Sequence, residues 1–459
     1  MSTQENSLRE NKMGTMPIFK LILSMSLPMM FSMFIQAMYN VVDSYFVAKI
    51  SENALTAVSL AFPLQNLMIS FAVGTSVGVN ALLSMRLGQK DPDAVNKTAM
   101  NGLFLCMATY ALFVIMGLVS IMPYFNSQID IQEIRDYGIT YMNIVIFVGF
   151  GLFGSVMCEK LLQSTGKALL SMWSQLAGAI TNIVMDPVLI FGLGPFPAMG
   201  IAGAAWATVA GQILALIIAL LLNVKFNKEI QFNWADFFRP SGKIIGQIYK
   251  IAFPSIILTS ITSFTTTLIN MILATFSSTA IAVYGLYFKL NSFIFMPVFG
   301  LNSGIVPIIA YNYGARNYKR LTRSVKMGLT IAFTIMVMGM LIFMLLPAKL
   351  LSLFEASEEM LSIGVPAMRI IASSFCGAAI AIVLGSVFQA LNSAMLSMIV
   401  SVSRQVLVLL PAAWLLSLTG NINNIWFCFP IAEIASVVLS LVFYNNVYKK
   451  KILPLKSNQ

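Results

Sequence analysis

The chain has few charged residues and no histidine. Only 10% of its 459 residues are charged and 58% are hydrophobic, whereas a soluble domain has about 25% charged residues. Water is therefore excluded as the main solvent of the folded chain. The absence of histidine removes the side chain that most often carries protons near neutral pH, so any proton transfer is left to carboxylates.

Cysteine is also scarce, with four residues that all lie in apolar segments: Cys106, Cys158, Cys376 and Cys428. Such positions favour buried free thiols over a disulfide framework. The sequence has no metal-ligand or nucleophile–base cluster, and we expect neither an enzyme nor a cofactor. The net charge of +11 comes from bases beside apolar runs, which favours anionic lipid head groups over nucleic acid as partners.

Long apolar runs separated by short polar breaks recur along the whole chain, and each approaches the roughly 20 residues that cross a bilayer. They predict an all-α integral membrane protein of twelve transmembrane helices. The expected spans are 18–47, 54–83, 97–121, 137–158, 168–192, 201–223, 247–276, 280–310, 323–346, 362–388, 393–417 and 424–447.

The basic residues predict the orientation of these helices. With a cytoplasmic N-terminus, only Lys49, Arg135 and Lys349 fall in outer loops, and Lys289, Arg369 and Arg404 lie at membrane depth. The rest of the 28 bases lie in cytoplasmic segments. Because cytoplasmic loops are rich in Lys and Arg, both termini are expected in the cytoplasm.

The chain matches itself at an offset of 226 residues. This single shift aligns Pro28 with Pro254, Gly74 with Gly300, Gly78 with Gly304 and Gln163 with Gln389. We therefore expect two six-helix lobes, 1–223 and 247–459, joined by a cytoplasmic linker, 224–246. Units with an even number of spans enter from the same side, so the lobes are expected to be related by a pseudo-two-fold axis along the membrane normal, and rocking lobes would give alternating access.

Two of the expected helices carry polar stripes that cannot favourably face lipid. Residues three and four apart share a helical face. The stripe in 18–47 consists of Gln36, Asn40 and Asp43, and the stripe in 168–192 consists of Gln175, Gly178, Asn182 and Asp186. Each stripe needs a polar partner.

Asp43 and Asp186 both belong to the outer half of the membrane, since each lies about 30 Å beyond the cytoplasmic start of its helix at ~1.5 Å per residue. Burial and mutual repulsion oppose ionisation of both carboxylates, whereas a bound cation favours it. The pair therefore predicts a site that exchanges H⁺ or Na⁺. In the alternative, Asp43 only caps its helix and Asp186 bonds a neighbouring helix.

The second half of the repeat lacks this acid pair, because the shift places Ile269 and Ala412 at the two positions. It carries Lys289 and Glu433 at membrane depth instead. They either form an ion pair, or Lys289 faces a hydrated cavity while Glu433 bonds separately within its lobe.

Several polar or adaptable residues are candidates for a substrate cavity: Met33, Gln36, Asn40, Thr266, Asn270 and Lys289. The alternatives are packing for the methionine and bonds from threonine to carbonyls of its own helix.

Three segments carry a family resemblance: 26–49, 161–194 and 297–320. They contain Asp43, the Asn182-x-x-x-Asp186-Pro motif and a Pro307-x-x-x-Tyr311-Asn-x-Gly-Ala motif, in this order. The chain resembles the multidrug and toxic compound extrusion (MATE) family, and within it the bacterial multidrug exporters.

The resemblance implies a V-shaped pair of lobes that exports amphiphilic cationic compounds in exchange for H⁺ or Na⁺. Asp43, Asn182 and Asp186 match the family's N-lobe cation site, and Thr208 matches its fourth member. Some branches place further acids in helices 7 and 10; those expected helices contain none here, so a C-lobe cation site is not expected.

These expectations describe a monomeric, multi-pass transporter of the bacterial cell membrane. Two rivals stay open. A lipid-linked oligosaccharide flippase of the same superfamily would need a basic central cavity, for which only Lys289 is available, and a channel would not need an asymmetric acid pair.

Overall fold

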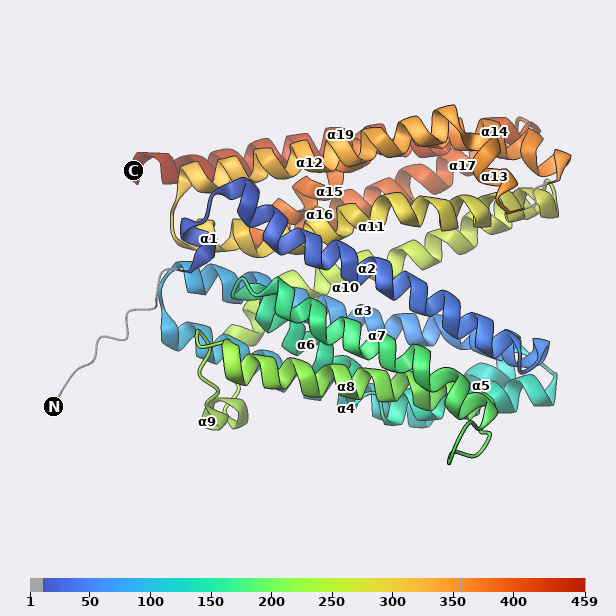
Figure 1. The fold of residues 1–459 in the computed structure, drawn as a ribbon. Helices are drawn as coiled ribbons and strands as arrows, with labels where there is room; N and C mark the ends of the chain where they lie inside the picture. Colours follow the sequence, from blue (N-terminus) through green and yellow to red (C-terminus); the bar gives the residue numbers. More distant parts are fainter. Residues whose placement is uncertain (1–10, 355–356, 459) are drawn as a thin grey trace. The chain divides into compact units, whose positions relative to one another are not determined.

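The computed structural model describes residues 11–354 and 357–458, and all regular structure in this part of the chain is helical (Figure 1). The helices of the first half are α1 (Lys12–Thr15), α2 (Ile18–Ala48), α3 (Glu52–Gly88), α4 (Pro92–Gln128), α5 (Gln132–Phe147), α6 (Phe150–Ser164), α7 (Ala168–Phe191), α8 (Ile201–Phe226) and α9 (Trp234–Phe238). Those of the second half are α10 (Gly242–Ala274), α11 (Ser278–Gly314), α12 (Tyr318–Leu345), α13 (Pro347–Ser352), α14 (Glu358–Ala372), α15 (Phe375–Ala390), α16 (Ala394–Val402), η1 (Ser403–Leu409), α17 (Leu410–Ser417), α18 (Ile422–Ile425), α19 (Cys428–Val447), η2 (Tyr448–Ile452) and η3 (Leu453–Asn458).

Ten of the described helices or helix runs are long and apolar enough to cross a membrane. Two bent pairs, α5 with α6 and α14 with α15, pass the same test together, which brings the number of spans to twelve when each pair is one span. The predicted all-helical membrane fold is confirmed.

The two bent pairs are a feature that the sequence did not predict, since 137–158 and 362–388 were expected as unbroken helices. α5 and α6 meet at 45°, and α14 and α15 meet at 47°. Val148 at the first break and Ser374 at the second correspond under the 226-residue shift. In the second break, the side-chain hydroxyls of Ser373 and Ser374 donate to the carbonyls of Ile370 and Ile371. The same carbonyls also accept the backbone N–H groups of these two serines, so both stay satisfied at the bend.

The chain divides into two compact units. Unit 1 holds the described residues up to Thr15 together with Phe31–Ile256, and unit 2 holds Met16–Met30 together with the described residues from Ile257 onward. The first half of α2 thus packs within unit 2, and the first half of α10 packs within unit 1. These limits differ from the lobes 1–223 and 247–459 expected from the sequence by these two exchanged helix halves.

The expected linker, 224–246, is attached to unit 1. It contains the end of α8, the short helix α9 and the start of α10. The backbone N–H groups of Gln231 and Ser241 donate to the side chains of Asn96 and Asn101 on α4. Phe237 of α9 also packs edge-on against Phe104 of α4.

Candidate functional site

Asp43 of α2 and Asp186 of α7 come together within unit 1. Their carboxyl groups lie within hydrogen-bonding reach of each other. Asp186 is fully buried and Asp43 is half-buried. Asp43 Oδ1 and both carboxylate oxygens of Asp186 have no hydrogen-bond donor. Two carboxylates this close in an apolar environment need a shared proton or a cation to offset their repulsion.

The same site contains an amide and a hydroxyl from the contact between α7 and α8. Asn182 Nδ2 donates to Thr208 Oγ1 over 3.4 Å, and both side chains are buried. The Asn182 Oδ1 is left without a donor. Because Asn182 lies one helical turn before Asp186, the face of α7 presents a row of oxygen atoms, which are the ligands that hard cations prefer.

Glycine makes this contact between α7 and α8 possible. A Cβ at Gly178 would lie 2.9 Å from the Gly211 carbonyl oxygen, and a Cβ at Gly211 would lie 2.6 Å from the Gly178 oxygen. The two helices therefore approach backbone to backbone, as small residues allow in membrane proteins. This close approach places Thr208 against Asn182.

Pro187 lies inside α7, which remains continuous from Ala168 to Phe191. Proline has no N–H, so the carbonyl of Ile183 lacks its usual donor four residues later. This carbonyl lies in the turn that also contains Asp186.

Tyr141 of α5 is a member of the site that sequence reasoning missed. It is 2% exposed, its hydroxyl is within hydrogen-bonding reach of Thr208 and Gln65, and it interacts electrostatically with Asp43. The available signal was a phenol in the outer half of an apolar helix, since a buried tyrosine hydroxyl normally has a polar partner.

The stripe on α7 serves two different polar groups. Gln175 Nε2 donates to Glu159 Oε2 over 2.9 Å, and Ser174 Oγ donates to Glu159 Oε1 over 3.1 Å. Glu159 of α6 is buried and was also missed from the sequence. Gln175 thus satisfies this acid, whereas Asp186 faces Asp43 and Asn182 contacts Thr208.

The residues expected in a substrate cavity are divided between the units. Met33, Gln36 and Asn40 belong to unit 1, and Thr266, Asn270 and Lys289 belong to unit 2. Gln36, Asn40 and Lys289 are exposed. Thr266 Oγ1 donates to the Thr262 carbonyl of its own helix, as in the packing alternative, whereas Asn270 Oδ1 is buried without a donor.

The ion pair between Lys289 and Glu433 is wrong. Glu433 Oε2 instead accepts from an Arg404 guanidinium nitrogen at 3.0 Å, and Lys289 is exposed. The alternative, in which Glu433 bonds separately within its own half of the chain, is the one found. The partner was missed because a π-helical turn, η1, sets the direction of Arg404.

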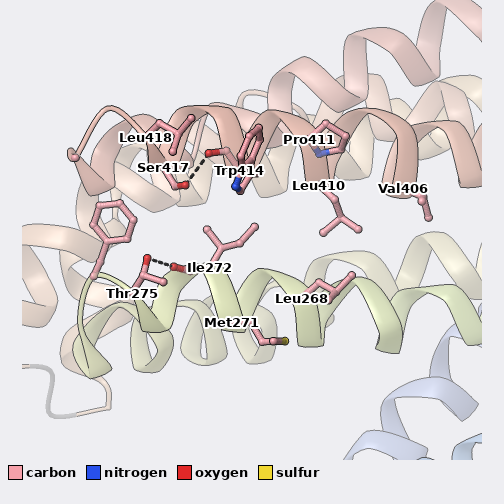
Figure 2. Close-up of a pocket in the computed structure, with 12 residues that line it drawn as sticks. Leu268, Met271, Ile272, Thr275, Val406, Leu410, Pro411, Trp414, Ser417 and Leu418 are labelled. Atoms are coloured by element: carbon pink, nitrogen blue, oxygen red, sulfur yellow. Dashed lines mark hydrogen bonds between the residues drawn. The ribbon is translucent and has the colours of Figure 1, made fainter.

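Unit 2 has an apolar groove, but Ile269 and Ala412, which correspond to Asp43 and Asp186 under the 226-residue shift, do not line it. The cavity measures about 1070 Å³, and Figure 2 shows Leu268 and Ile272 of α10 facing Leu410, Pro411 and Trp414 of α17. Under the 226-residue shift these two helices correspond to α2 and α7. The hydroxyls of Thr275 and Ser417 donate to the carbonyls of Ile272 and Trp414, so they offer no unused donor.

Comparison with known proteins places this geometry in a family. The MatE family model matches residues 28–188 and 254–415, one segment in each half of the internal repeat. The FAD transporter of Shewanella oneidensis is 25% identical over 423 residues, which cover 91% of this chain and 92% of that protein. The multidrug export protein MepA of Staphylococcus haemolyticus is 24% identical over 434 residues, covering 93% and 94%.

Solved structures show the same fold. A crystal structure of MATE in complex with MaL6 gives a TM-score of 0.88 at 24% identity and full coverage of both chains. A MOP superfamily transporter from Pyrococcus furiosus gives 0.89 at 23% identity, covering 98% of this chain and all of that one. With both segments of the repeat matched by the family model and the fold shared over the whole chain, this protein belongs to the MatE family of multidrug and toxic compound extrusion transporters.

Proposed function

We propose that the protein is a secondary active exporter that moves amphiphilic cationic compounds out of the cell in exchange for H⁺ or Na⁺. The observation that carries this proposal is the contact between Asp43 and Asp186, which leaves acceptor oxygens without donors inside unit 1. Asn182 and Thr208 complete an oxygen-rich site that a proton or a small hard cation satisfies.

The site couples two fluxes because its occupancy decides which state of the transporter is stable. With the site empty, the repulsion between the carboxylates favours a conformation that separates them or takes up an ion. With an ion bound, the outer half of α2 is drawn to α7. A ligand shifts such an equilibrium only through its different affinity for the two states, and Asp43 supplies that difference because it sits on a helix shared between the two units.

Exchange of one cation for one cation is electrically balanced. Exporting a monovalent cation against an inside-negative potential costs about 2.3 kcal/mol per 100 mV, and one entering H⁺ or Na⁺ returns the same amount. The chemical gradient of the entering ion is then available to drive accumulation outside.

The experiment is transport in proteoliposomes with proton and sodium gradients imposed separately. Ethidium movement should require one of the two gradients in the wild type, and Asp186→Asn should abolish the gradient-driven part at equal protein content. Asp130→Asn is the matched control, because Asp130 is an exposed acid in the same unit. Undiminished gradient-driven transport by Asp186→Asn would exclude this site from coupling.

A second substrate class is favoured by one relative, since the Shewanella oneidensis protein is an FAD transporter of comparable similarity. FAD is anionic, so its export would not balance the charge of an entering cation one for one. The same liposomes loaded with FAD distinguish the two: competition between FAD and ethidium indicates a shared path, and transport of FAD alone replaces the cationic substrate by a dinucleotide.

The topology belongs to the same proposal. We place both termini in the cytoplasm, and the protein in the bacterial cell membrane as a monomer. The cytoplasmic assignment follows from the concentration of Lys and Arg in alternate loops. Cysteine labelling from outside intact cells should then reach Asp130→Cys in the α4–α5 loop, and it should not reach Asp91→Cys in the α3–α4 loop.

A further inference from the structure

Unit 2 contains an ion pair at membrane depth. Arg404 of η1 and Glu433 of α19 are 3.0 Å apart, with side-chain exposures of 32% and 7%. The other two salt bridges among the described residues, Lys97 with Asp93 and Lys167 with Glu229, lie near cytoplasmic helix ends. A charge pair within the spans is costly to desolvate and is not expected to improve stability over apolar residues, so its presence calls for a role.

Two features of the backbone accommodate this pair, a π-helical turn at Arg404 and a glycine beside Glu433. Arg404 lies in the π-helical run Ser403–Leu409, which interrupts the span that begins at α16 and ends at α17. Such turns are frequent at functional positions because they rotate the following side chains. On the other side, a Cβ at Gly377 of α15 would lie 2.8 Å from the Glu433 Cγ, so only glycine leaves room for the glutamate there.

The internal repeat places this pair next to the positions that correspond to the cation site of unit 1, because Arg404 and Glu433 themselves fall on Gly178 and Ala207. Under the 226-residue shift, Asn182 and Thr208 fall on Val408 and Ile434. Arg404 precedes Val408 by four residues, or one helical turn, and Glu433 is adjacent to Ile434. The same two helices therefore meet through polar groups in both halves. In unit 1 the carboxylate oxygens of Asp186 have no basic side chain bonded to them. In unit 2 the guanidinium of Arg404 is bonded to the carboxylate of Glu433.

Few other ionisable groups face Glu433. Tyr287 of α11 interacts electrostatically with both Arg404 and Glu433, and with Cys428 of α19. Cys376 is the sole ionisable residue of α15, and α16, η1 and α17 contribute only Arg404. On α14, Glu358 and Glu359 are exposed, and Arg369 Nε donates to the Met344 carbonyl. The second carboxylate oxygen of Glu433, Oε1, is buried without a donor.

We propose that Arg404 is a tethered cation that permanently fills a second cation site in unit 2. Its guanidinium replaces an exchangeable ion on Glu433, so unit 2 takes no part in ion exchange and the coupling ion is restricted to unit 1. The comparison with unit 1 rests on the function proposed above, but the site itself does not. Removing Arg404 should expose a carboxylate that must bind a proton or a Na⁺, because an isolated buried charge is strongly disfavoured.

The test measures the number of protons that the protein takes up. All variants are made in the double variant Asp43→Asn/Asp186→Asn, which lacks the carboxylates of the unit 1 site. Purified protein in lipid nanodiscs is titrated in sodium-free buffer between about pH 9 and about pH 5, the range in which buried carboxyls and few other groups gain protons. Arg404→Met should take up one more proton per protein than Arg404→Met/Glu433→Leu, and added Na⁺ should reduce that excess. Arg404→Lys, which keeps the charge, should show no excess.

Two results would overturn the proposal. One is equal proton uptake by Arg404→Met and by the double variant. The other concerns the double variant alone, which should fold because apolar replacement of a buried ion pair is often neutral or stabilising. If Glu433 is always paired, Arg404→Met/Glu433→Leu takes up as many protons as its parent, and a deficit of one proton would show that Glu433 is an exchanging group. This second comparison holds even if Arg404→Met does not fold.

Discussion

Gly304 of α11 lies directly against Ser26 of α2, since a Cβ at Gly304 would come within 2.4 Å of the Ser26 Oγ. The Ser26 hydroxyl donates to the Leu301 carbonyl at this crossing. Under the 226-residue shift, Gly304 corresponds to Gly78 and Ser26 corresponds to Ala252. These two residues are also in contact within unit 1, since a Cβ at Gly78 would lie 3.0 Å from the Cβ of Ala252. The halves of α2 and α10 that are exchanged between the units are thus held by equivalent glycine crossings.

Gly304→Ala should destabilise the protein, although alanine is the better helix former. The added methyl group has no space beside Ser26, and overpacking of this kind costs about 1–3 kcal/mol. We expect a lower midpoint of thermal unfolding in detergent. Gly285→Ala on the same helix is the control, because a Cβ there meets nothing within 4 Å.

A second variant identifies the contact responsible. Gly304→Ala combined with Ser26→Gly removes the closest atom and should restore part of the lost stability, despite loss of the hydrogen bond to Leu301. Equal unfolding midpoints for Gly304→Ala and Gly285→Ala would show that the crossing is not tightly packed.

The sequence was sufficient to locate the spans, though not the bends within two of them, and to indicate that Asp43 and Asp186 need polar partners, for a physical reason. A helix in lipid satisfies its own backbone, so hydropathy alone delimits the spans. The side chains of Asn182 and Asp186 share a face by helical geometry and must find polar partners, which left Asp43 as a candidate. Neither step requires knowledge of tertiary packing.

The partner of Glu433 could not be predicted in this way. Lys289, Arg369 and Arg404 were all bases at membrane depth, and the choice among them depends on helix rotation. The π-helical run at Ser403–Leu409 changes that rotation, and nothing in an apolar segment indicates where such a turn occurs. The breaks between α5 and α6 and between α14 and α15 escaped for the same reason, since each segment is apolar on both sides of its bend.

Tyr141→Phe should weaken cation binding without abolishing it. The phenol hydroxyl reaches Thr208 and Gln65 beside Asp43, and a hydrogen bond of this kind contributes about 1 kcal/mol, which corresponds to a several-fold change in affinity. The measurement is the cation concentration, as H⁺ or Na⁺, that half-saturates ethidium transport.

Tyr110→Phe is the control for that variant. Tyr110 donates to the Phe147 carbonyl over 2.6 Å and lies in the same unit, so it loses a comparable hydroxyl away from the carboxylates. If both phenylalanine variants shift the half-saturating concentration equally, Tyr141 acts only through packing.

Glu159→Gln should keep ion-coupled transport, in contrast to Asp186→Asn. Glu159 accepts hydrogen bonds from Ser174 and Gln175, so its carboxylate is already satisfied within unit 1. A glutamine can keep one acceptor oxygen, and we expect a loss of about 1–3 kcal/mol in stability from the poorly matched amide. Loss of coupling at normal folding would make Glu159 part of the ion path.

Lys12→Met should remove a pH dependence of stability at the N-terminal helix of unit 1, α1. Lys12 belongs to α1, outside the spans, and burial, followed by the nearby charge of Lys167, lowers its pKa below the ordinary value of 10.5. The unfolded chain therefore binds this proton more tightly than the folded protein does. Wild-type stability should rise as the pH increases through the lowered pKa toward 10.5, because the folded state then no longer carries the disfavoured charge.

Methionine keeps the apolar stem of Lys12 without its charge, so Lys12→Met should be more stable than the wild type at neutral pH and should lose the alkaline rise. The unfolding midpoints of both proteins, measured at neutral and at alkaline pH, test this directly. Lys20→Met is a suitable control, because Lys20 is an exposed base at the start of α2. A wild-type rise that persists in Lys12→Met would assign the pH dependence to another group, since the lowered pKa of Lys12 predicts that the difference between the two proteins shrinks as the pH approaches 10.5.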